Sequence, residues 1–143
     1  MKLCQRLARI WLALVLISQI VLLPPSHAAT PKITGSYKIT ENTDLGTQVR
    51  ITLQISFVNP GTTPVTITRV GLPSGSVPAQ LVTATSNLVV HSHASSQVSL
   101  QFLMSKRDFD AWHVASHQLF LITLEPSGGK PALINLPLLR TQG

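Results

Sequence analysis

The chain has 143 residues, of which 44% are hydrophobic, and a formal net charge of +6 at pH 7. This length and apolar content are sufficient for one domain with its own core, and no segment has the biased composition of a long disordered tail. The single cysteine, Cys4, excludes an internal disulfide, so stability must come from the core.

The first 28 residues have the three parts of a secretory signal peptide. Three cations form a basic start, an apolar run follows over residues 10–23, and small residues precede a cleavage site after Ala28. An uncleaved membrane anchor is the alternative, but the run is shorter than the roughly 20 apolar residues that span a bilayer. We therefore expect a periplasmic or secreted protein with a single mature domain over residues 29–143.

Removal of this leader lowers the charge of the working protein. Three of the 11 lysines and arginines lie within it, so eight remain against five acidic residues and the net charge falls to +3. The remaining cations are scattered along the chain, and only Lys106 and Arg107 are adjacent. Nucleic-acid recognition needs clustered cations interleaved with stacking aromatics, so the sequence argues against it.

The strongest secondary-structure signal lies in residues 47–72. Apolar residues alternate with polar ones in its first half: Val49, Ile51, Leu53, Ile55 and Phe57. This period of two predicts a strand with one buried face. Asn59-Pro60-Gly61 predicts a turn, and residues 65–70 predict a second strand. The apolar phase of that strand changes between Ile67 and Val70, which predicts a β-bulge.

Weaker strand signals occupy residues 33–40, 81–85 and 88–90, and a loop is expected over residues 42–46. Residues 98–104 alternate clearly and predict another strand. The period then breaks, and Ser105 or Asp108 is suited to cap a single helical turn with Phe109 and Trp112 on one side.

Two further strands are expected near the C-terminal end. Residues 119–124 form a nearly continuous apolar run, which is typical of a central strand. Residues 132–139 follow a Pro- and Gly-rich loop and form the last strand. Because Pro137 lacks a backbone donor, we expect this strand at a sheet edge, at least near its end.

These signals predict an all-β protein, namely a single antiparallel immunoglobulin-like β-sandwich of seven to eight strands, with a small closed barrel as the alternative. The succession of a strand, an Asn-Pro-Gly turn and a β-branched strand over residues 51–70 resembles the immunoglobulin-like modules of bacterial secreted and cell-envelope proteins. The resemblance implies a fold and an extracytoplasmic setting, without a specific activity.

Four histidines remain after cleavage, and their spacing suggests a metal site. If residues 89–93 are extended, His91 and His93 point the same way, and if residues 113–117 are helical, His113 and His117 share a face. Convergence of the two pairs would suit copper or zinc. Exposed loop histidines are the simpler interpretation, and no cofactor is expected.

Catalytic signals are weaker than the histidine pattern. The serine of Gly71-Leu72-Pro73-Ser74-Gly75 lies one position too late for a nucleophile elbow, and no enzymatic activity is expected. Phe109 and Trp112 could stack on a sugar ring or anchor a partner, although such residues more often close one end of a core.

The sequence therefore ranks three functions. The first is a non-enzymatic protein-protein interaction or structural module of the cell envelope, whose partner is another envelope protein or a surface polymer. The second is a periplasmic copper- or zinc-binding protein that uses the four histidines. The third is a carbohydrate-binding module centred on Trp112.

Overall fold

The computed structural model describes residues 32–73, 79–83, 87–115 and 117–142. This part of the chain contains β1 (Thr34–Asp44), β2 (Gln48–Asn59), β3 (Val65–Gly71), β4 (Gln80–Leu81), β5 (Leu88–Val90), β6 (Ala94–Ser105), α2 (Lys106–Trp112), β7 (His117–Pro126) and β8 (Ala132–Arg140). The predicted all-β class is confirmed. The leader expected over residues 1–28 lies outside the described residues.

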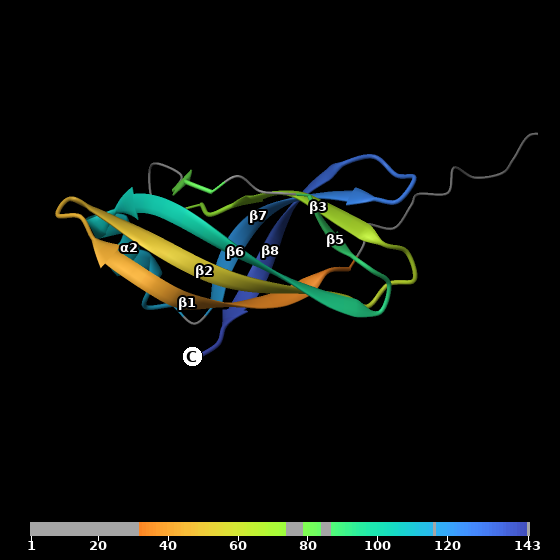
Figure 1. Cartoon of the computed structure of the whole chain (residues 1–143), viewed down its shortest axis with the longest axis horizontal. Coiled ribbons are helices and arrows are strands. Elements are labelled where there is room, and N and C mark those ends of the chain that lie inside the picture. The colour runs from red at the N-terminus through yellow and green to blue at the C-terminus, as the bar shows by residue number, and fades with distance from the viewer. Residues whose placement is uncertain (1–31, 74–78, 84–86, 116, 143) are drawn as a thin grey trace, which may run out of the picture.

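The strands form one sheet in the order β4-β6-β2-β1-β8-β7-β3-β5, curled into a half-barrel (Figure 1). Six of its neighbouring pairs are antiparallel. β1 and β8 are parallel and pair Ser36 with Leu139 and Tyr37 with Arg140. The expectation of a purely antiparallel sheet is wrong at this pair, because β1 and β8, the first and last strands in chain order, run in the same direction.

β2 has the buried face that its alternation predicts. Its five alternating apolar side chains are at most 4% exposed: Val49, Ile51, Leu53, Ile55 and Phe57. β1 pairs along one side of β2 and β6 along the other over its whole length. The pairing with β1 continues to Asp44 opposite Val49, so the loop predicted over residues 42–46 is wrong for residues 42–44.

The turn and the bulge that were predicted after β2 are both present. The Asn59 side chain accepts a hydrogen bond from the Gly61 amide over 3.0 Å, which closes the turn after β2. The register between β3 and β7 shifts between Ile67 and Arg69, as the change of apolar phase indicated.

Pro137 lies in an interior strand, so the edge position predicted for β8 is wrong. β8 lies between β1 and β7 in the sheet, and Pro137 faces Leu119 of β7. The pairing with β1 involves only Leu139 and Arg140. In the described part of the chain Pro137 therefore has no partner on the β1 side, where a missing N–H breaks no ladder hydrogen bond.

The core lies on the concave side of the curled sheet. One cluster of buried residues receives side chains from both halves of the sheet and from α2. α2 begins after Ser105, whose hydroxyl oxygen accepts a hydrogen bond from the Asp108 amide over 3.1 Å. The predicted helical turn with a serine cap is thus confirmed. Among the described residues, no helix has the length and apolar character needed to cross a bilayer.

Candidate functional site

The first predicted metal-binding pair lies in the turn between β5 and β6. The Ala94 amide donates to the His91 carbonyl oxygen over 3.3 Å, and the His93 amide donates to the Gly61 carbonyl oxygen over 3.2 Å. His93 has a φ of 54°, which places it in the left-handed region. Both histidines are exposed, and they occupy a tight turn instead of the extended segment on which the prediction of a shared metal depended.

The second predicted pair is divided between two elements. His113 caps the C-terminal end of α2, whereas His117 begins β7. The ring of His113 stacks on that of Phe109 with a centroid distance of 4.9 Å, and its Nδ1 lies 3.0 Å from the Phe109 carbonyl oxygen. A carbonyl oxygen only accepts, so Nδ1 serves as the donor in this contact. The predicted helical spacing from His113 to His117 is absent.

The two histidine pairs also lie far apart. His91 and His93 precede β6 and His113 follows α2. The length of β6 separates them, and the 11 steps between its 12 residues span about 37 Å at 3.4 Å each (Figure 1). No group of three or more metal-binding side chains occurs among the described residues. Metal binding stays a prediction, without a ligand set that the described structure brings together.

Phe109 and Trp112 form part of the core. They are 8% and 5% exposed, and the Trp112 ring lies 5.6 Å from that of Tyr37. Tyr37 in turn packs against Phe120 of β7 with a centroid distance of 5.3 Å. These four rings join α2 to both halves of the sheet, and neither predicted binding residue presents an open ring face to solvent.

The outer faces of the two halves of the sheet differ in polarity. On β2 and β6 the outward-facing side chains between Arg50 and Ser56 and between Ser95 and Gln101 are polar. On β7 and β8 the outward-facing positions are mostly apolar: Leu119, Leu121, Leu133, Pro137 and Leu139. We call these five residues the leucine face. Leu119, Leu133 and Leu139 are 53%, 64% and 46% exposed.

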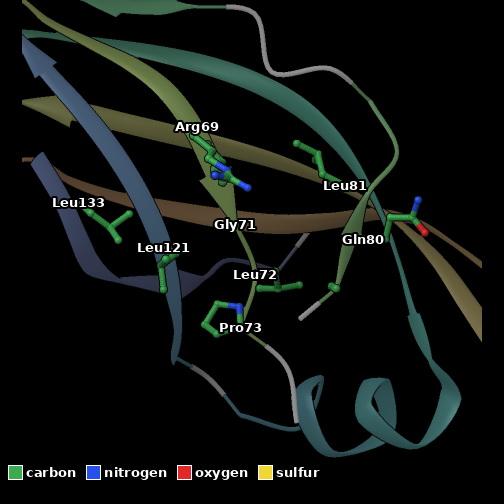
Figure 2. A pocket seen from close by; sticks show the side chains of 10 residues that line it. Arg69, Gly71, Leu72, Pro73, Gln80, Leu81, Leu121 and Leu133 are labelled. Carbon is green, nitrogen blue, oxygen red and sulfur yellow. The ribbon is translucent and has the colours of Figure 1, made fainter. Parts of the chain in front are cut away.

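A pocket of about 570 Å³ adjoins the leucine face at the end of β3. It is lined by residues of four strands and the segments next to them: Arg69, Val70, Gly71, Leu72, Pro73, Ala79, Gln80, Leu81, Leu121 and Leu133. In Figure 2, Leu121 and Leu133 lie on one side of β3, and Gln80 and Leu81 of β4 lie on the other. We call this hollow the β3 pocket.

The β3 pocket forms where the two ends of the curled sheet approach each other. β4 is one edge of the sheet and β3 lies next to the other edge. The Ala79 amide donates to the Leu72 carbonyl oxygen over 3.2 Å and so joins the two segments. Among the described residues, β5 pairs with Val65–Ile67, before the bulge and away from the end of β3 that lines the pocket.

Charge at the β3 pocket comes from Arg69, the one ionisable side chain among its described lining residues. The ion pair found in the described residues joins Lys106 to Asp44, at the opposite end of β2 from the turn at Asn59. The hydrogen bond from Lys106 lowers the pKa of the Asp44 carboxyl group, and Asp44 raises the pKa of Lys106. This ion pair links β1 to α2 and does not involve Arg69, so it does not neutralise the charge of Arg69.

Sequence reasoning missed both the leucine face and the β3 pocket. The apolar run over residues 119–124 contained the signal for the face, since an unbroken run places leucines on both sides of a strand. The predicted central strand is confirmed, because β7 lies between β8 and β3, but the outward-facing Leu119 is exposed. The β3 pocket has no local signal, because its residues come from strands that are distant in sequence.

Comparisons with known proteins leave the family open. No protein-family model and no curated protein match the chain. It is similar to the X-ray structure of Northeast Structural Genomics Consortium target SoR45, with 10% identity, coverage of 78% of this chain and 87% of that chain, and a TM-score of 0.44. A crystal structure of a protein from Archaeoglobus fulgidus matches with 9% identity, 78% and 97% coverage and a TM-score of 0.33. At these TM-scores neither similarity assigns a function.

Proposed function

We propose that the protein is exported, is not an enzyme, and binds another protein of the cell envelope through the leucine face. The observation that carries this proposal is the contrast between the two outer faces of one sheet. The outward positions of β2 and β6 are polar except for Val58 and Leu103, whereas β7 and β8 expose Leu119, Leu133 and Leu139 among fewer polar residues, with Leu119 opposite Pro137. Several large apolar side chains exposed on one face of a sheet are typical of protein interaction sites.

The proposal includes the compartment and the finer fold. The sequence of residues 1–28 supports export with cleavage after Ala28. The single core cluster, which receives side chains from β2 and β6 on one side and from β3 and β7 on the other, supports an immunoglobulin-like sandwich in which β1 connects the two layers. An experimental structure of the mature protein would test this arrangement.

Site-specific photo-crosslinking in the producing cell tests the interaction. A photoreactive amino acid replaces Leu119 or Leu139 on the leucine face, and Gln54 or Ser99 on the polar face in matched control variants. All four positions face outward, so the replacements leave the core intact. We expect one adduct of the same mass from positions 119 and 139 and none from positions 54 and 99.

Other outcomes contradict the proposal. Adducts of equal yield from both faces would indicate random collisions, and no adduct from either face would indicate that the leucine face has no partner. An adduct of twice the mass of the protein would replace the foreign partner with a second copy of this chain. A Leu119→Ser substitution should leave thermal unfolding nearly unchanged, because the side chain is 53% exposed.

A further inference from the structure

The β3 pocket has the size and lining of a site for a small molecule. Its volume of about 570 Å³ lies within the range of about 300–1,000 Å³ that is typical of ligand pockets. Apolar side chains from three directions line it, with Leu81 from β4, Leu121 from β7 and Leu133 from β8. A lining of this kind favours an aliphatic ligand, whose burial removes apolar surface from water.

A glycine keeps part of this space open. Gly71 faces outward at the end of β3, opposite Leu121. A Cβ atom added to Gly71 would lie 3.4 Å from the Leu121 Cβ, which is ordinary van der Waals contact, so a larger side chain fits the backbone there. Such a side chain would extend among the residues that line the pocket and would reduce the space for a ligand.

Arg69 supplies the charge of the pocket. Figure 2 shows its guanidinium group on the side of β3 that faces Leu81 of β4. The other described lining residues carry no ionisable side chain. An anionic group on the ligand would therefore meet a cation in the pocket, and a planar guanidinium matches a carboxylate through two parallel hydrogen bonds.

We propose that the β3 pocket binds an aliphatic carboxylate, with the carboxylate at Arg69 and the hydrocarbon chain against Leu81, Leu121 and Leu133. This proposal goes beyond binding of a protein partner, because it assigns a small-molecule ligand to a separate hollow. It shares Leu121 and Leu133 with the leucine face but does not require a partner there.

Calorimetric titration of the mature protein with decanoate tests the proposal. We expect saturable one-site binding with a dissociation constant of about 0.1–1 mM. Decyltrimethylammonium carries the same chain with a positive charge, and we expect it to bind at least about tenfold more weakly because it meets Arg69 as a like charge. Equal binding of both compounds would overturn the assignment of Arg69.

Variants locate the site. Arg69→Gln should weaken decanoate binding about fivefold, a modest effect because Arg69 is exposed to solvent. Arg50→Gln removes an exposed arginine from β2 and is the matched control, for which we expect unchanged affinity. Gly71→Val should weaken decanoate binding, because the valine side chain occupies part of the pocket and valine suits a strand.

A second blocking variant covers the case in which Gly71→Val fails to fold. Leu133 is 64% exposed, so Leu133→Glu should leave the melting curve unchanged while placing a negative charge in the pocket lining. We expect it to weaken decanoate binding and spare decyltrimethylammonium. Undiminished binding of decanoate in a folded Gly71→Val protein and in Leu133→Glu would overturn the proposal. If position 119 gives no crosslinked adduct while decanoate still binds, the proposed function is contradicted and the proposed ligand site is not.

Discussion

Asn59 forms hydrogen bonds both within its own turn and to a strand that is distant in sequence. It is the buried polar side chain found among the described residues, at 1% exposure. Its Nδ2 donates to the carbonyl oxygens of Thr63 over 2.9 Å and Val90 over 3.1 Å, while its Oδ1 accepts from the Gly61 amide. The same side chain therefore closes the turn after β2 and fastens that turn to β5.

Replacing this side chain should be costly. We expect Asn59→Ala to lower the free energy of unfolding by about 2–4 kcal/mol, because the buried carbonyl group of Val90 and the partly buried one of Thr63 lose their donor. Urea unfolding of both proteins measures the difference. Asn135→Ala, at an exposed position of β8, is the control and should change stability by less than about 0.5 kcal/mol. Equal losses would mean that the three hydrogen bonds contribute little.

Tyr37 provides a prediction about pH. Burial raises the pKa of its phenol above the ordinary value of 10.0, and the nearby positive charge of Arg140 lowers it by a smaller amount. The unfolded chain therefore releases this proton first. The stability that Tyr37 contributes through this shift is complete below about pH 10 and is lost as the pH rises through the pKa of the folded protein. Stability should thus decline above pH 10.

Tyr37 is the one tyrosine of the chain, so the absorbance of phenolate in an alkaline titration reports it alone. Tyr37→Phe should reduce the decline in stability above pH 10. At neutral pH it should change stability by less than about 1 kcal/mol, because the hydroxyl group is buried without a hydrogen-bond partner among the described residues. A phenol that titrates at its ordinary pKa would contradict this account.

Among single elements, α2 is where the sequence was most informative about an irregular feature. The break in strand period, a serine and two aromatic residues three positions apart predicted a short capped helix, and α2 has its cap at Ser105. Aromatic spacing alone left open whether Trp112 binds a ligand or fills the core. Its contacts with Tyr37 decide this, and they depend on a strand about 75 residues away.

The cap of α2 can be tested directly. We expect Ser105→Ala to lower the free energy of unfolding by about 1 kcal/mol, since the Asp108 amide loses its acceptor at the start of the helix. Hydrogen exchange of the Asp108 amide should accelerate at the same time. Ser99→Ala removes an exposed hydroxyl group from β6 and is the matched control. Similar changes in both variants would contradict the capping role.

The strands divide into those that local pattern predicts and those that it does not. β2 and β6 alternate regularly, because one of their faces meets the core and the other meets water. β7 has apolar residues on both faces, and the pattern predicted its interior place in the sheet but not its exposed Leu119. Periodicity reports which residues are apolar; it does not report what covers them.

At the scale of the whole molecule, the pairing of β1 with β8 was beyond the reach of local pattern. It joins Tyr37 to Arg140 across nearly the full described chain, and the two strands share no turn that would fix their register. Short loops in the sequence predicted which strands are neighbours, and strands joined by short loops run antiparallel. The single parallel contact instead depends on how the two halves of the sheet fold over a common core.

This contact leads to a prediction about truncation. A chain that ends at Leu136 lacks Leu138, which is fully buried, and the two residues that connect β8 to β1. Loss of one buried leucine removes about 2–5 kcal/mol, and a domain has only about 5–15 kcal/mol of net stability. Removal of this segment also disconnects the two halves of the sheet. We therefore expect the truncated protein to show no cooperative unfolding transition by circular dichroism.

A chain that ends at Thr141 is the matched control. It keeps the hydrogen bond from the Thr141 amide to the Tyr37 carbonyl oxygen, 2.8 Å long, and loses only two residues beyond the sheet. We expect its denaturation midpoint to equal that of the full mature chain. If the shorter protein instead unfolds cooperatively with a similar midpoint, then the core alone holds the two halves together and the β1–β8 pairing is dispensable, because a half-barrel without that connection would still close around its buried side chains.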